Sequence, residues 1–308
     1  MAVFLFPGQG SQLVGMGQDL YDTYPEVSNL YDTAADALDF DIREVSFSGP
    51  EDRLRETQIT QPALFVHSMA VDLLLQKSGT YPEATAGHSL GEFSAVVSAG
   101  AMDFNDALQV VKIRGREMSQ AGERAPGAML AIMGATEQQI GEICNKATDD
   151  KQIVVPANMN GPGQVVLSGH QEAINSAVEL AKGMGLRRVI RLNVSSAFHS
   201  PLMTTARQGL QRALESVEIR DAKVPVYQNV TAKPERSAAR IKENLLLQLE
   251  NPVRWEMSVR QMAADGFKRF LEVGAGKVLQ GLNRRILPDL ETVLVGTVED
   301  IGAFHGLS

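Results

Sequence analysis

A single serine lies between two glycines in the stretch Gly87-His88-Ser89-Leu90-Gly91. This Gly-x-Ser-x-Gly spacing is typical of a nucleophile elbow, a sharp turn from a strand into a helix that exposes the serine hydroxyl. Glycine suits both sides of the turn because it has no Cβ to collide with the folded backbone. Since small-residue turns without chemistry share the pattern, Ser89 is a candidate nucleophile that still needs a base.

Five histidines could supply that base. His199 is the strongest candidate because it directly precedes a predicted helix. The next two residues, Ser200 and Pro201, are expected to be the N-cap and the first residue of that helix. The positive end of that helix would lower the pKa of His199 and keep the ring neutral, although a loop histidine without chemistry is the alternative. The others are expected elsewhere: His67 in an apolar core helix, His88 in a structural role in the elbow, His170 at a helix start and His305 in a loose tail.

Arg114 is the candidate for recognising a charged substrate. It lies in a predicted helix, in the stretch Arg114-Gly115-Arg116-Glu117-Met118. A guanidinium holds a carboxylate through two parallel hydrogen bonds, so it could select an acyl group that ends in a second carboxylate. A solvated helix arginine is the alternative, and it is the expected role of Arg116.

Two glycine-rich turns resemble nucleotide-binding loops but lack the residues that such loops need. Gly8-Gln9-Gly10 and Gly274-Ala275-Gly276 are each followed by a leucine where the third glycine of G-x-G-x-x-G would stand. No P-loop triplet and no zinc-ligand spacing occurs, so neither a cofactor nor a metal is expected. The first turn could instead offer backbone N–H groups to an oxyanion, as could Leu90, the residue after the elbow serine.

Composition limits the class of protein. The 308 residues are 44% hydrophobic, which is enough for a substantial core. A formal charge of -8 argues against a nucleic-acid-binding or membrane-surface protein. The single cysteine, Cys144, cannot form an intrachain disulfide and is expected in the core. Without a basic leader or a run of ~20 apolar residues, the sequence predicts a cytoplasmic protein.

The hydrophobic pattern predicts an α/β body interrupted by a small unit. A strand at Val3–Phe6, a helix from Pro62 to Gly79 and the elbow come first. Residues 127–192 then follow the order β-α-β-β-α-β of a ferredoxin-like unit, and α/β segments return after Pro201. The expected domains are a large body of residues 1–123 and 196–308, with its parallel sheet, and a small subdomain of residues 124–195.

Seven ordered motifs together resemble the malonyl-CoA:acyl carrier protein transacylases over nearly the whole chain. They are FPGQGSQ (6–12), GHSLGE (87–92), RGREM (114–118), NMNGPGQVVLSG (158–169), AFHSPLM (197–203), NPVRW (251–255) and EVGAGKVLQGL (272–282). The resemblance implies a hydrolase-like α/β body with an inserted ferredoxin-like subdomain, as the pattern does.

The resemblance also assigns roles to individual positions. It implies that Ser89 is the acylated nucleophile, that His199 is the base and that Arg114 binds the free malonyl carboxylate. The remaining positions are the oxyanion-hole N–H groups of Gln9 and Leu90, the main-chain carbonyl of Gln248 that orients the histidine, and the substrate-binding residues Phe198 and Asn160.

The implied activity is a two-step acyl transfer in fatty-acid biosynthesis. A malonyl group would pass from malonyl-CoA to Ser89 and then to the phosphopantetheine thiol of acyl carrier protein. A serine thioesterase or other hydrolase is the alternative, because the same elbow and histidine would serve water. A noncatalytic carrier-binding scaffold is a third possibility.

Docking of an acidic carrier protein on an acidic enzyme requires a local cationic surface. The candidates, for which a solvated charge run is the alternative, are Arg187, Arg188, Arg191, Lys277, Arg284 and Arg285.

Overall fold

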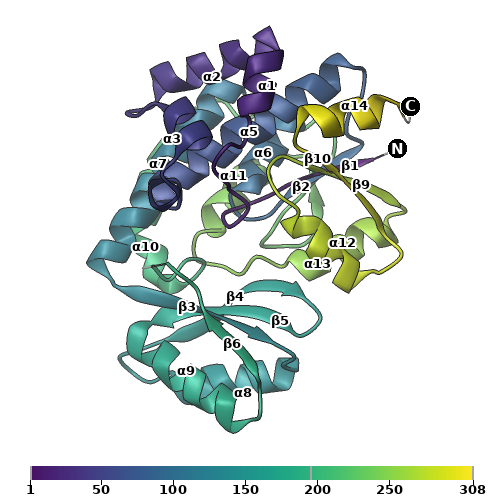
Figure 1. The fold of residues 1–308 in the computed structure, drawn as a ribbon. Helices are drawn as coiled ribbons and strands as arrows, with labels where there is room; N and C mark the ends of the chain where they lie inside the picture. Colours follow the sequence, from purple (N-terminus) through teal and green to yellow (C-terminus); the bar gives the residue numbers. More distant parts are fainter. Residues whose placement is uncertain (1, 195, 307–308) are drawn as a thin grey trace.

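A six-stranded sheet forms the centre of the protein in the computed structural model, which describes residues 2–194 and 196–306 (Figure 1). The strand order is β10-β9-β1-β2-β7-β8, and all neighbours are parallel except β7 and β8. The strands are β1 (Val3–Phe6), β2 (Ala84–Gly87), β7 (Val226–Tyr227), β8 (Pro234–Glu235), β9 (Arg269–Val273) and β10 (Glu291–Val295). The predicted α/β class with a parallel sheet is confirmed.

Helices cover both faces of this sheet. They are α1 (Gln18–Thr23), α2 (Pro25–Ala37), α3 (Ile42–Ser48), α4 (Glu51–Leu54), α5 (Thr57–Lys77), α6 (Gly91–Ser98), α7 (Phe104–Arg124), the 3-10 turn η1 (Pro201–Met203), α10 (Thr204–Glu215), α11 (Ala238–Leu247), α12 (Trp255–Ala264), α13 (Val278–Ile286) and α14 (Val298–Gly306). Because side chains alternate along a strand, Phe4 and Phe6 pack with α5 and α6, whereas Val3 and Leu5 pack with α12 and α13.

A second, antiparallel sheet of four strands lies below the body in Figure 1. Its elements are β3 (Gly127–Met133), α8 (Glu137–Ala147), β4 (Val154–Gly161), β5 (Gln164–His170), α9 (Gln171–Gly183) and β6 (Arg188–Arg191). The order β4-β5-β3-β6 and the two helices on one face form the predicted ferredoxin-like arrangement. Leu130 of β3 faces those helices, whereas Met129 and Ala131 join the hydrophobic cluster of the body.

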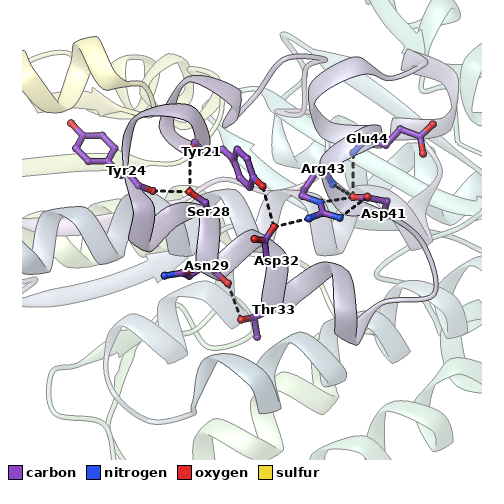
Figure 2. A network of polar contacts seen from close by, with 9 residues as sticks. All are labelled: Tyr21, Tyr24, Ser28, Asn29, Asp32, Thr33, Asp41, Arg43 and Glu44. Carbon is purple, nitrogen blue, oxygen red and sulfur yellow. Dashed lines mark hydrogen bonds and ion pairs between the residues drawn. The ribbon is translucent and has the colours of Figure 1, made fainter.

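The first three helices are tied together by polar contacts at the surface, as Figure 2 shows. Arg43 donates to Asp32 of α2 and to Asp41, whose carboxylate also caps the N-terminus of α3. Tyr21 of α1 donates to the same Asp32 oxygen over 3.1 Å. The hydrogen bond from Arg43 lowers the pKa of Asp41 to about 2. Such half-exposed ion pairs contribute little to the free energy of unfolding. Their effect is to orient the first three helices relative to one another.

Three predicted elements differ from those observed. Helix α5 begins at Thr57, so Pro62 lies inside the helix instead of at its first residue. Burial of nearly the whole of this helix offsets the one hydrogen bond that the proline removes. The stretch of residues 158–163 is rich in turn-forming residues and predicts a turn between two strands. Strand β4 nevertheless continues through it to Gly161, because its pairing with β5 continues across two register shifts. His305 lies in α14 and not in a loose tail.

Within the described parts of the chain, no helix combines the length and the apolar character that crossing a bilayer would require.

Candidate active site

The elbow at Ser89 is a strained turn that neighbouring atoms hold in place. Ser89 has φ 52°, in the left-handed region that residues with a side chain rarely adopt. A Cβ on Gly87 would lie 1.9 Å from the Gly91 carbonyl carbon, and one on Gly91 would lie 2.0 Å from the Phe6 carbonyl oxygen. The Ser89 N–H donates to Asn229 Oδ1 over 2.7 Å. The two glycines therefore let β1, β2 and α6 meet, and the serine is left at the apex.

His199 meets Ser89 although 110 residues separate them along the chain. Its Nε2 lies 2.8 Å from Ser89 Oγ, and its Nδ1 lies 2.8 Å from the main-chain oxygen of Gln248. A carbonyl oxygen can only accept, so Nδ1 carries the proton and Nε2 is free to accept from the serine hydroxyl. The chain Ser89–His199–Gln248 has the geometry of a nucleophile, a base and a group that orients the base.

The pKa of His199 is lowered to about 3, chiefly by burial and next by the positive charge of Arg114. The sequence predicts a lowered pKa and assigns it to a helix N-terminus, whereas the causes found here are burial and Arg114. Ser200 does cap a helical start by accepting from Leu202 N–H, but the start is the 3-10 turn η1 and the ring is buried. The consequence is the expected one, because the imidazole is neutral at physiological pH.

Arg114 is buried beside the serine and not solvated on its helix. Only 1% of its surface is exposed. Its Nη2 donates to Ser89 Oγ over 3.0 Å and to Gln248 Oε1 over 2.8 Å, and its Nη1 donates to Gln61 Oε1 over 2.6 Å. The guanidinium also lies 5.3 Å from the Phe93 ring centroid. Burial lowers its pKa, and the nearby carboxylate of Glu92 opposes that effect.

A cavity of about 110 Å³ opens over these groups. Its wall comes from loops and helices of the body, from two strands of the small sheet and from the segment that follows β6. The lining residues are Gln9, Gln61, His88, Ser89, Leu90, Arg114, Met118, Met129, Asn158, Leu192, Val194, Phe198 and His199. The backbone N–H groups of Gln9 and Leu90 have no hydrogen-bond partner among the described residues. Two such donors beside a nucleophile are what an oxyanion hole requires.

Asn160, which the resemblance assigns to substrate binding, does not line the cavity. Its Oδ1 lies 2.8 Å from Nε2 of His88, and that ring is 5.6 Å from Trp255. Asn158, two residues earlier on β4, lines the cavity instead. His88 thus links the elbow to the small sheet, which fits the structural role expected for it.

The remaining histidines lie apart from this cavity. His67 is buried in α5, as predicted, and burial lowers its pKa to about 4. His170 stands at the start of α9, where its Nδ1 accepts from Ile153 N–H over 3.0 Å.

Several polar residues beneath the serine were not found from the sequence. Asn229 contacts the elbow, Gln61 contacts Arg114, and Gln228 contacts Glu92. No sequence motif around these residues identifies them as part of the site. Glu92 did carry a signal, since it is a charged residue on the otherwise apolar start of α6, three positions after Ser89.

Close relatives match this chain over almost its whole length. The family model described as "Acyl transferase domain" matches residues 3–298. The malonyl CoA-acyl carrier protein transacylase of Bacillus subtilis (strain 168) is 43% identical, with 97% of this chain and 94% of that protein covered. The namesake from Staphylococcus aureus (strain MRSA252) is 42% identical, with 98% and 97% covered.

Solved structures agree with the sequence matches. The malonyl-CoA:acyl carrier protein transacylase of Xanthomonas oryzae pv. oryzae aligns with a TM-score of 0.95 at 37% identity, covering 99% of this chain and 98% of that one. A malonyl-transacylase in complex with a type II PKS acyl-carrier protein aligns with a TM-score of 0.95 at 39% identity and 99% coverage of both chains. This chain therefore belongs to the acyl transferase domain family, as a member of the malonyl-CoA:acyl carrier protein transacylases.

Proposed function

We propose that this enzyme moves a malonyl group from malonyl-CoA to the phosphopantetheine thiol of acyl carrier protein, through a malonyl ester of Ser89, in fatty-acid biosynthesis. The observation that carries the proposal is the presence of Ser89, His199 and Arg114 in one cavity, joined by hydrogen bonds of 2.8 and 3.0 Å. The first two groups form a nucleophile and base, and the third is a buried cation that a hydrolase of neutral esters would not need.

In the first half-reaction Ser89 Oγ attacks the thioester carbonyl and its proton passes to His199 Nε2. The negative charge on the carbonyl oxygen is stabilised by the N–H groups of Gln9 and Leu90. The carbon–sulfur bond then breaks, and the coenzyme A sulfur takes the proton from His199. In the second half-reaction the carrier thiol gives its proton to His199 and attacks the ester carbonyl. The bond from the carbonyl carbon to Ser89 Oγ then breaks, and Ser89 Oγ takes the proton back from His199.

Selectivity is assigned to Arg114. The free carboxylate of a malonyl group is two carbon–carbon bonds from the carbonyl carbon that Ser89 attacks. A guanidinium nitrogen 3.0 Å from Ser89 Oγ can therefore hold this carboxylate while the ester forms. Phe198 is assigned to the apolar wall beside the acyl group, and the contact of Asn160 with His88 supports only an indirect effect on substrate binding.

Intact-mass spectrometry tests the proposal. Wild-type protein incubated with malonyl-CoA should gain the mass of one malonyl group, and acyl carrier protein added afterwards should remove it. Ser89→Ala should stay unmodified, whereas Ser94→Ala, at a buried serine in the helix that follows the elbow, should still be acylated. Prompt release of malonate without a thiol would favour the hydrolase, and carrier binding without any acylation would favour a scaffold.

Two further assignments accompany the function. We place the domain boundaries so that residues 1–123 and 196–308 form the body and residues 124–195 the small subdomain. The separate hydrophobic cluster under α8 and α9 supports this division, and residue 195 itself lies outside the described residues. A cytoplasmic location is supported by the single cysteine, the buried Cys144. Cell fractionation tests the location.

A further inference from the structure

Glu92 is a fully buried carboxylate directly beneath the nucleophile. It lies in the first turn of α6 and has 0% of its surface exposed. Its Oε1 accepts from Gln228 Nε2 over 2.7 Å, and its Oε2 accepts from Gln248 Nε2 over 2.7 Å and from Asn229 N–H over 3.1 Å. Every partner of this carboxylate is a donor, which is the environment that an ionised carboxylate needs when it is buried.

The contact with Gln248 fixes which end of that amide faces Arg114. Because the Gln248 nitrogen points to Glu92 and to the Ser89 carbonyl, its Oε1 is left to accept from Arg114 Nη2. A reversed amide would place its NH₂ group against the guanidinium, donor against donor. The main chain of the same residue accepts from His199 Nδ1. Gln248 thus accepts hydrogen bonds from both His199 and Arg114, and Glu92 fixes the orientation of the Gln248 side chain.

The contact with Asn229 supports the elbow itself. Asn229 receives the Ser89 N–H on its Oδ1 and donates from Nδ2 to the Gly87 carbonyl over 2.7 Å. These bonds hold the backbone on the N-terminal side of Ser89, the residue with φ 52°. Since a strained turn persists only when its surroundings hold it, the anchor of Asn229 on Glu92 stabilises the exposed position of the serine.

We propose that Glu92 is a positioning residue for acyl transfer and the buried counter-charge of Arg114: its ionised carboxylate holds Gln248 and Asn229 in the orientations that His199, Arg114 and Ser89 require. The inference rests on the proposed function. It assigns Glu92 no contact with substrate, since its effect passes through Gln248 and Asn229.

The protonation of Glu92 gives the proposal a measurable signature. Burial raises the pKa of Glu92 to about 7, opposed by its hydrogen bonds and by Arg114. The other titratable or charged groups facing this region are Arg114 on α7, His88 and His199 beside the serine, and Asp72 on α5, which accepts from Ser98 at the far end of α6. Burial lowers the pKa of both His88 and His199, so neither histidine gains a proton near neutral pH.

The test measures the single-turnover rate of Ser89 malonylation between about pH 5 and pH 8. The donor is malonyl-N-acetylcysteamine, which carries no phosphate to titrate. The wild-type rate should fall as the pH decreases below about 7, because protonated Glu92 no longer accepts from all of its donors. Glu92→Gln should be about 10- to 100-fold slower at pH 8, as for residues that orient the ligands of metal sites, and its rate should stay constant over this range.

A matched control comes from Glu272 in β9. This carboxylate is also fully buried, burial raises its pKa to about 7, and it accepts from Leu279 and Gln280 N–H at the start of α13, away from Ser89. Glu272→Gln should keep the wild-type rate within about twofold and the wild-type pH dependence.

The outcomes separate the two proposals. A Glu92→Gln rate equal to wild type, or with the same fall at low pH, overturns the role of Glu92 while leaving malonyl transfer intact. If wild-type Ser89 is never malonylated, the proposed function itself fails. Should Glu92→Gln not fold, the wild-type profile decides, because a constant wild-type rate from pH 8 to pH 5 contradicts a role for ionised Glu92.

Discussion

Arg114 shows how burial gives a helix residue the environment that its proposed role in selectivity requires. A guanidinium removed from water is costly unless charged or polar partners replace its hydration. Here the neutral amide oxygens of Gln61 and Gln248 contact the guanidinium directly, and the carboxylate of Glu92 reaches it only through Gln248. The cavity therefore keeps positive charge beside Ser89 that a substrate carboxylate can neutralise.

The first prediction concerns this charge. Arg114→Ala should lower kcat/KM for malonyl-CoA by roughly 30-fold or more, corresponding to ~2 kcal/mol or above for a lost buried charge pair. Acetyl transfer should fall much less, so the ratio of malonyl to acetyl transfer decreases. Arg116→Ala, on the same helix with a half-exposed side chain, is the control and should keep the wild-type ratio. An unchanged ratio in Arg114→Ala would remove its assigned role.

Elements meet most closely where the elbow packs against β1. The absent Cβ of Gly91 lets the first turn of α6 approach the Phe6 carbonyl oxygen. Gly141 in α8 differs, because a Cβ there would meet no atom within 4 Å. Helix α6 therefore requires glycine at position 91, whereas α8 has room for a larger side chain at position 141.

Substitution of the two glycines by alanine should have opposite effects on the free energy of unfolding. Gly91→Ala should destabilise the protein by about 1–3 kcal/mol through overpacking, and should slow Ser89 acylation as well. Gly141→Ala should stabilise it by about 0.5–1 kcal/mol, because alanine is the better helix former. Urea denaturation measures both, and a stabilised Gly91→Ala would contradict the close packing at the elbow.

Helices α5 and α6 are joined by a buried carboxylate that should make stability depend on pH. Asp72 accepts from Ser98 Oγ and Gln76 Nε2 over 2.8 Å, and burial raises its pKa to about 7. In the unfolded chain the group loses its proton near pH 4, so unfolding is increasingly favoured as the pH rises from about 4 to 7.

Asp72→Asn should remove that contribution. The decrease in the free energy of unfolding from about pH 4 to pH 7 should be smaller in the variant by up to ~3 kcal/mol. Asp36→Asn, at an exposed position of α2, should behave as wild type. Equal pH dependence in Asp72→Asn and wild type, measured by chemical denaturation, would show that Asp72 titrates normally in the fold.

At the scale of the whole molecule, the cavity lies where the body and the four-stranded sheet meet. The six candidate docking cations fall into two exposed groups at opposite edges of that sheet. Arg188 and Arg191 lie on the edge strand β6, whereas α13, which carries Arg284 and Arg285, packs against β4. Arg285 also donates to Gln164 of the small sheet over 2.5 Å.

Charge reversal on α13 tests its part in carrier docking. Arg284→Glu combined with Arg285→Glu should raise KM for acyl carrier protein, more strongly at low salt, because an acidic partner would meet negative charge. The malonyl-CoA half-reaction should change little. Lys182→Glu, at an exposed position of α9, is the control. An unchanged carrier KM in the double variant would assign these arginines to a solvated surface.

The sequence by itself determined the parts of the protein that local chemistry specifies. The spacing of Gly87, Ser89 and Gly91 predicts the elbow, and Thr136 with Gln139 forms the capping box that opens α8. The order of strands and helices predicts the ferredoxin-like unit. These features depend on neighbours a few residues apart, so they can be recognised without a fold.

Only the tertiary structure decided which distant polar groups meet. From the end of β7, Asn229 reaches the elbow and Gln228 reaches Glu92. Pro62 lies inside α5 because the helix around it is buried. The same is true of the His199 pKa, which burial and the charge of Arg114 lower. Hydrogen bonds and desolvation act through space, and chain neighbours do not encode them, so this network became visible only once the sheets had packed.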